Sequence, residues 1–266
     1  MRDESAMRAT LVRRTAVAAS VVSLALLATA CGGSDSDDKG EAKAPAAKDT
    51  ATKAAVKALT AAELEKVSLA QGDVAGHKIG EAGPEDVSQA ADITADKKEC
   101  EPLGHAFYAA QRGAPVGTAV RKVVQEPKKG DVKDAKDPAG ALAAGLDVTT
   151  TLVALASYEG DGAEKNLAEL RDAASACAGG FTLSTKDGKQ KFAKVTEAKA
   201  SGGEEALAWT LVMEEEGVQV PLKLVSLRQA GTVATFASLN VGAAAGAVSD
   251  FELPSEVIAA QVKELG

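Results

Sequence analysis

The chain has 266 residues and a formal net charge of −8, which argues against a nucleic-acid-binding surface because such surfaces are basic. Hydrophobic residues make up 45% of the chain but aromatic residues only 3%, so a core has to be built mainly from Ala, Val and Leu. The larger apolar residues recur in patterned segments after the first quarter of the chain, which predicts one folded domain over residues 59–266.

The first part of the chain has the layout of a signal peptide. Residues 1–14 are basic on balance, and residues 16–30 form an apolar stretch that ends in small residues just before Cys31. The five residues that end at Cys31, LATAC, resemble a bacterial lipobox, with Ala28 where Leu is usual. The resemblance implies that residues 1–30 are removed and that Cys31 carries a diacylglyceryl lipid, with acyl chains such as palmitate.

Two alternatives concern this segment. A retained membrane-spanning helix is one, but fifteen apolar residues fall short of the roughly 20 that cross the hydrocarbon core. The pair Arg13-Arg14 leaves twin-arginine export open beside the general secretory route.

Residues 31–58 follow as a polar spacer. They are rich in Gly, Ser, Asp, Lys, Ala and Pro, with Val56 as the one larger aliphatic residue. Such a composition cannot bury enough apolar surface to offset the entropy of ordering. It predicts a lipidated cysteine on a disordered tether with a typical span of roughly 30 Å.

The domain is expected to open with a helix over residues 59–71. Thr60 and Glu63 have the spacing of a capping box, and Leu59 and Leu64 have the spacing of a hydrophobic staple. Gly72 is expected to end this helix.

Periodicity and turn residues predict the remaining elements. Strands are expected at 77–80, 118–125 and 149–158, and helices at 100–111, 139–145 and 161–177, with Asp161 as the cap of the last. An antiparallel meander is expected from strands at 181–185, 191–198, 206–214, 219–228 and 232–241, before a final amphipathic helix that starts at Pro254. The predicted class is α+β, an antiparallel sheet with helices packed on it.

Cys100 and Cys177 remain once Cys31 is assigned to the lipid. An even pair in an exported domain predicts a disulfide between them, with two buried free thiols as the alternative. The bridge would close a loop of about 77 residues, which contributes about 4 kcal/mol in the chain-entropy model.

The sequence gives little support to catalysis. The chain has two histidines, His77 and His105, and none of the common nucleophile, zinc, phosphate-loop or dinucleotide motifs. We therefore expect no enzyme, no cofactor and no metal site. His105 and Tyr108 are three residues apart and can share a helix face, and Trp209 is the only tryptophan. These three are the candidate ligand-binding residues, although each can equally be structural.

Residues 58–265 resemble the PknH-like extracellular sensor domain family. The resemblance is carried by the opening helix, by Glu99-Cys100 ahead of a short helix with Tyr108, by a helix that ends at Cys177, by the Trp209 strand and by the closing helix. It implies an α+β fold with an antiparallel sheet and a cleft for an unidentified ligand. Kinase-type members have two disulfides, of which only the Cys100 and Cys177 positions match here.

The predicted function is that of a non-enzymatic, lipid-anchored ligand-binding or sensor-like lipoprotein at the extracytoplasmic face of the cell membrane. Its expected partners are the membrane, through Cys31, an unknown small molecule or envelope component, and a membrane protein, but no nucleic acid. An envelope carrier of lipids or glycolipids is the alternative and requires a large apolar cavity. An extracellular hydrolase is a further one and requires ionisable residues that converge around His77 or His105.

Overall fold

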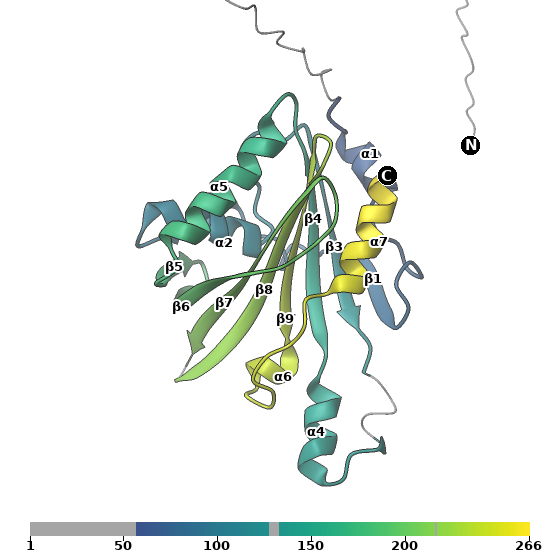
Figure 1. Ribbon diagram of the computed structural model, residues 1–266, viewed down its shortest axis with the longest axis vertical. Coiled ribbons are helices and arrows are strands. Elements are labelled where there is room, and N and C mark those ends of the chain that lie inside the picture. The colour runs from purple at the N-terminus through teal and green to yellow at the C-terminus, as the bar shows by residue number, and fades with distance from the viewer. Residues whose placement is uncertain (1–56, 128–132, 216) are drawn as a thin grey trace, which may run out of the picture. The chain divides into compact units, whose positions relative to one another are not determined.

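The computed structural model describes residues 57–127, 133–215 and 217–266 (Figure 1). The expected signal peptide, Cys31 and the tether up to residue 56 lie outside the described residues.

A single nine-stranded antiparallel sheet forms the centre of the domain, in the order β1-β3-β4-β9-β8-β7-β6-β5-β2. The strands are β1 His77–Glu81, β2 Thr94–Ala95, β3 Gly117–Gln125, β4 Thr149–Ser157, β5 Phe181–Thr185, β6 Gly188–Ala198, β7 Glu205–Glu215, β8 Val218–Gln229 and β9 Thr232–Asn240. The helices are α1 Ala61–Lys66, α2 Glu101–Phe107, α4 Pro138–Leu146, α5 Gly162–Ala176, α6 Val241–Ala244 and α7 Ser255–Leu265, with 3-10 turns η1 Ala90–Asp92 and η2 Lys98–Cys100. The predicted α+β fold is confirmed.

The predicted meander is present as β5 to β9, each strand paired with the next. β4 then pairs with β9, for example Ala154 with Thr235, and β3 and β1 continue the sheet beyond it. The two-residue strand β2 pairs with β5 at the opposite edge.

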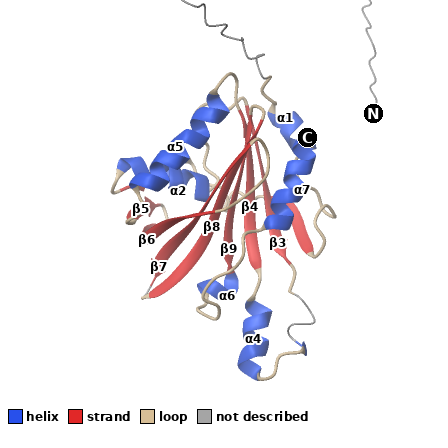
Figure 2. Ribbon diagram, in the orientation of Figure 1, coloured by secondary structure: helices blue, strands red, loops and turns tan. Residues whose placement is uncertain are grey.

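Helices cover the two faces of the sheet in pairs. Figure 2 shows α2 and α5 together at one side of the sheet and α1 and α7 together at the other. β8 contributes to the packing under both helix pairs, because successive side chains of a strand point to opposite faces of the sheet. Leu222 and Leu224 join the core under α2 and α5, whereas Val225 and Leu227 join the core under α1 and α7. None of the described helices combines the length and the apolar character that crossing a membrane requires.

Two helix ends were predicted wrongly, and one predicted cap lacks its side-chain hydrogen bond. α1 keeps its predicted capping box but ends at Lys66 instead of residue 71. The chain leaves the helix to bury Leu69, and Gln261 of α7 holds it there: Gln261 Nε2 donates to Val67 O at 2.7 Å, and Gln261 Oε1 accepts from Leu69 N at 3.3 Å.

α2 ends at Phe107 instead of residue 111. Asp161 occupies the N-cap position of α5, but its side chain forms an ion pair with Lys165 in place of a cap hydrogen bond.

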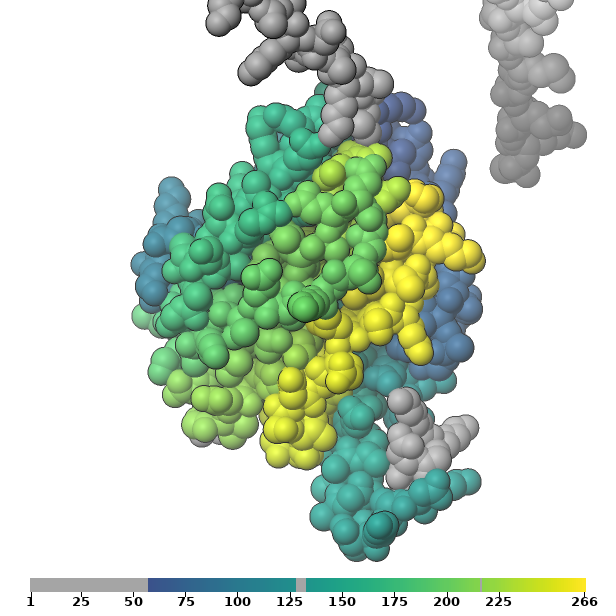
Figure 3. Space-filling view, in the orientation of Figure 1, coloured from purple at the N-terminus to yellow at the C-terminus, as the bar shows by residue number. Residues whose placement is uncertain are grey.

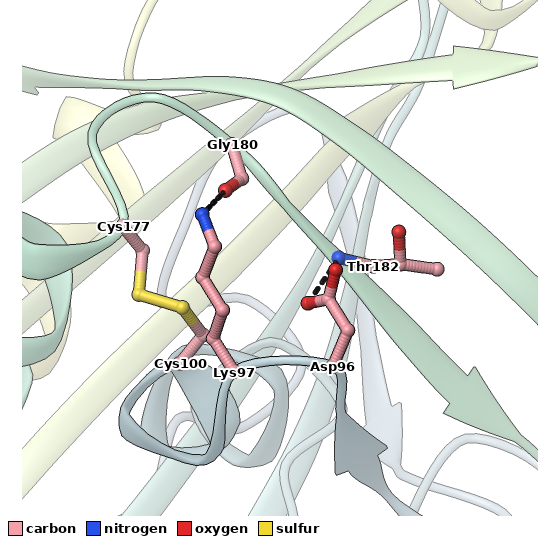
Figure 4. The surroundings of a disulfide bond; sticks show 6 residues. All are labelled: Asp96, Lys97, Cys100, Cys177, Gly180 and Thr182. Carbon is pink, nitrogen blue, oxygen red and sulfur yellow. Dashed lines mark hydrogen bonds between the residues drawn. A yellow bond between two sulfur atoms is a disulfide. The ribbon is translucent and has the colours of Figure 1, made fainter.

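The predicted disulfide joins Cys100 to Cys177, and both residues are fully buried (Figure 4). It links the start of α2 to the end of α5. Two hydrogen bonds flank it, from Lys97 Nζ to Gly180 O at 2.8 Å and from Thr182 N to Asp96 Oδ1 at 2.9 Å. The alternative of two free thiols was wrong.

Candidate functional site

Small side chains leave space under the end of α2. On the sheet face that α2 partly covers, β3, β4 and β9 present Thr118, Ala154, Ala156 and Thr235. Together with the end of α2 and residues 87–90, they line a cavity of about 170 Å³. We call it the Arg112 cavity, after the one Arg, Lys, Asp or Glu among its described lining residues.

Arg112 reaches this cavity because the chain reverses after α2. Ala109 takes a left-handed conformation with φ of 51°, and Ala110 N donates to His105 O at 2.8 Å. This turn sends the following residues back under the helix, and Arg112 ends only 8% exposed. Its Nη1 donates to Asn166 O on α5 at 3.3 Å.

Tyr158 fixes the backbone of Arg112. Its hydroxyl donates to Arg112 O at 2.9 Å and accepts from Asn166 Nδ2 at 2.9 Å. Together with the bond from Arg112 Nη1, these contacts close a small network that joins the α2–β3 loop, the end of β4 and α5. The guanidinium is thus placed by neighbours that themselves are buried.

Burial dominates the electrostatics of this network. It lowers the pKa of Arg112 to about 10, against the opposing effects of Tyr158 and Glu169. Arg112 therefore remains a cation at neutral pH. Burial also raises the pKa of Tyr158, so that its hydroxyl stays protonated and able to donate.

His105 lines the same cavity from α2. Its Nε2 is buried and has no hydrogen-bond partner among the described residues. Buried polar atoms without a partner are uncommon, and an absent ligand or water is one reason for them. His105 and Arg112, whose side chains both carry nitrogen groups, thus line the same cavity.

The structure separates the three candidate ligand-binding residues. His105 lines the Arg112 cavity, but Tyr108 packs against the core and donates its hydroxyl to Gln190 Oε1 on β6. Trp209 is 4% exposed and belongs to the core under α2 and α5. Tyr108 and Trp209 thus do not line the cavity that His105 lines, and a ligand-binding role for the three residues stays a prediction.

His77 lines a different and larger cleft of about 480 Å³ between β4 and residues 248–257. Acidic side chains gather there: Asp147, Asp250, Glu252 and Glu256. The two histidines do not share a cavity. Within the described ranges, no group of three or more His, Cys, Asp or Glu residues could hold a metal ion.

An apolar groove of about 650 Å³ lies beside α7, which packs as the yellow segment along the green strands in Figure 3. Residues 199–202 form one wall, and Leu253, Ile258 and Val262 form the other. We call it the α7 groove. Its lining consists of Gly, Ala, Leu, Ile and Val residues together with Lys199 and two serines.

Sequence reasoning did not find Arg112. A single arginine between Gln111 and Gly113, just past a predicted helix, is typical of an exposed loop. The turn at Ala109 that buries it uses a residue for which the left-handed conformation is uncommon, so no local signal marks it.

Comparison with known proteins finds a likeness in structure but no match in sequence to a protein family or a curated protein. No protein-family model matches the chain, and no curated protein matches it. The chain is similar to the crystal structure of the extracellular domain of PknH from Mycobacterium tuberculosis, with a TM-score of 0.43 and 12% sequence identity. The match covers 79% of this chain and 98% of that domain.

Proposed function

We propose that the protein is a non-catalytic, ligand-binding or sensor-like lipoprotein, anchored through Cys31 to the extracytoplasmic face of the cell membrane. Its ligand enters the Arg112 cavity, between α2 and the sheet. The bound state is passed on by contact with a membrane protein partner.

The buried Cys100–Cys177 disulfide carries the proposal of location. Such bridges persist in oxidising compartments and are rare in the cytosol. The signal-peptide layout of residues 1–31 accounts for delivery to such a compartment. Two acyl chains on Cys31 would give stable anchoring, since each buried methylene contributes about 0.8 kcal/mol and one chain alone is marginal.

The Arg112 cavity supports the binding role. It is concave, pre-formed and lined by small apolar side chains with a few polar groups that converge, which are the features of a small-molecule site. Because the α2–β3 loop forms part of its wall, a ligand there contacts a segment at the domain surface, where a partner can detect the change.

The anchor is tested by replacing Cys31 with Ser in the full chain and following membrane fractionation and metabolic lipid labelling. We expect the parent to be labelled and membrane-bound, and Cys31→Ser to lose both properties. A Ser34→Ala variant, which changes the neighbouring spacer and keeps the cysteine, should behave as the parent. Membrane retention in Cys31→Ser, with no label in the parent, would refute the lipid anchor.

The α7 groove favours a second candidate, the envelope lipid or glycolipid carrier. Its volume of about 650 Å³ and its apolar lining suit an acyl chain, and Lys199 at the margin suits a polar head group. This function predicts that lipid extracted with the purified protein decreases when Ile258→Asp places a charge in the groove. Equal lipid in parent and variant would argue against the carrier.

A further inference from the structure

Within the described residues, the guanidinium of Arg112 has no carboxylate partner, unlike comparable cations of the domain. Arg112 is 8% exposed, and no described carboxylate lies within ion-pair distance of it. Other side chains with 8–13% exposure each pair with a carboxylate: Arg121 with Glu65, Lys223 with Asp250 and Arg228 with Glu204.

An unpaired buried cation is costly, because removal from water is not offset by an opposite charge. One hydrogen bond, from Nη1 to Asn166 O, leaves most of the donors of the guanidinium without a described acceptor. The fold nevertheless places the group by a turn at Ala109 and by the Tyr158 network. Such an arrangement is expected where a bound anion completes the charge pair.

The described lining of the cavity contains no acidic side chain that would repel a bound anion. No Asp or Glu is among its described lining residues, although the whole chain carries a net charge of −8. The cleft beside His77, by contrast, is lined by four acidic residues. Glu169, which acts on Arg112 from α5, is exposed and does not line the Arg112 cavity.

The cavity also has an entrance and a second donor. Gln89, Gln111 and Thr118 line it and are exposed, so solvent reaches it from that side. His105 contributes the buried Nε2 that has no described partner. A volume of about 170 Å³ is below the range of sites for drug-sized ligands and suits a molecule of a few non-hydrogen atoms.

We infer that the Arg112 cavity binds a small oxyanion, a phosphate or a carboxylate group, on the guanidinium of Arg112 and Nε2 of His105. The planar fork of a guanidinium pairs with two oxygens of such a group at once. His105 in the tautomer that carries its proton on Nε2 donates to a further oxygen. This inference rests on the proposed function, since it names the ligand class of the same cavity.

The two histidines make the test direct, because His77 is an internal control. The full chain, in detergent, is titrated with inorganic phosphate and, separately, with acetate, against chloride at matched ionic strength. Imidazole signals are followed by NMR. We expect the His105 signals to shift and saturate with one or both oxyanions while the His77 signals stay constant.

Variants separate binding from folding. In Arg112→Met the half-saturation concentration is expected to rise by at least about tenfold, since a charge-assisted pair is lost. Arg112→Lys keeps the positive charge but not the planar fork, so its half-saturation concentration should lie between those of the parent and Arg112→Met. It replaces Arg112→Met in the test if that variant does not fold. Arg121→Met removes a paired cation elsewhere and should leave the His105 response unchanged.

Absence of a His105 shift with either anion, or the same shift in Arg112→Met and Arg112→Lys as in the parent, would overturn the inference. The outcome is independent of the anchor. If the parent carries no lipid but its His105 signals respond to an anion, the proposed lipoprotein is contradicted and the anion site is supported. If the parent is lipid-labelled and membrane-bound but its His105 signals do not respond, the anion site alone is contradicted.

Discussion

At the level of single residues, the Thr60–Glu63 capping box is the clearest link between sequence and structure. Thr60 N donates to Glu63 Oε2 at 2.8 Å, and Glu63 N donates to Thr60 Oγ1 at 3.3 Å. These bonds satisfy backbone N–H groups that a helix start otherwise leaves unpaired. The three-residue spacing between Thr60 and Glu63 was sufficient to predict these bonds, because both partners lie within one helical turn.

The capping box predicts a pH dependence of stability. Hydrogen bonds from the Thr60 backbone and side chain, with Lys57 nearby, lower the pKa of Glu63 from 4.5 to about 2. A lowered pKa in the folded state stabilises the protein above the unfolded pKa, and this contribution is lost as the pH falls from about 4.5 towards 2. In Glu63→Gln, which keeps the hydrogen bonds but does not titrate, the free energy of unfolding should decline less over this interval.

Urea unfolding at several pH values measures this difference. Thr60→Ser keeps the hydroxyl and should show the decline of the parent. Parallel curves for the parent and Glu63→Gln between pH 4.5 and 2 would show that the carboxylate does not stabilise the fold in this way.

Arg112 marks the limit of prediction at the same scale. Its sequence neighbours suggested an exposed loop, yet it is buried by contacts with Tyr158 and Asn166, about 50 residues further along. Trp209, chosen as the one tryptophan, lies in the core, and Tyr108, chosen for its spacing from His105, packs against the core. Residue type alone does not distinguish a core aromatic from a ligand contact.

At the level of elements, strands were predicted better than helix ends. The hairpin turns at Asp187-Gly188 and Ala230-Gly231 separate the strands of the meander clearly in the sequence, and β5 to β9 appear close to the expected ranges. The ends of α1 and α2 depend on tertiary contacts, the burial of Leu69 and the turn at Ala109, which no local pattern encodes. The pairing of β4 with β9 joins segments about 80 residues apart and was likewise not predictable from turns.

The disulfide is the element-scale feature with the largest predicted effect. It ties α2 to α5 and closes a loop with a sequence separation of 77. Removing it through the double variant Cys100→Ala/Cys177→Ala is expected to reduce the free energy of unfolding by about 2–5 kcal/mol. Urea unfolding under oxidising conditions measures this loss.

Two controls accompany the double variant. The parent should approach its stability after reduction and alkylation, and Cys31→Ser should match the untreated parent. A double variant within about 0.5 kcal/mol of the parent, or an intact mass of the parent with two free thiols, would contradict a stabilising bridge.

At the level of the whole molecule, the sequence predicted the sheet and the disulfide but not the site. The Arg112 cavity combines a loop at 87–90, the end of α2 and the strands β3, β4 and β9, the last of which comes much later in the chain. Ala154 and Ala156 of β4 line it beside residues of α2, a proximity that only the folded arrangement reveals. His105 was selected from the sequence because it can share a helix face with Tyr108; it lines the Arg112 cavity, and its role in binding stays a prediction.

The proposed function combines three features in one protein: a lipid anchor, an exported domain with a disulfide, and a cavity for a small ligand. The α7 groove offers a competing use of the same domain, with an acyl chain beside α7 in place of a small anion under α2. The two functions predict different ligands bound to the purified protein, a lipid in the α7 groove or a small anion in the Arg112 cavity.

Mass spectrometry of the protein extracted from its own membrane tests the central claim most directly. Under denaturing conditions we expect a chain that begins at Cys31, carries a diacylglyceryl group and contains one disulfide. Under native conditions we expect an additional small ligand that is released on unfolding, whereas a bound lipid would favour the carrier. A chain that retains residues 1–30, with Cys31 unmodified, would contradict the proposed lipoprotein.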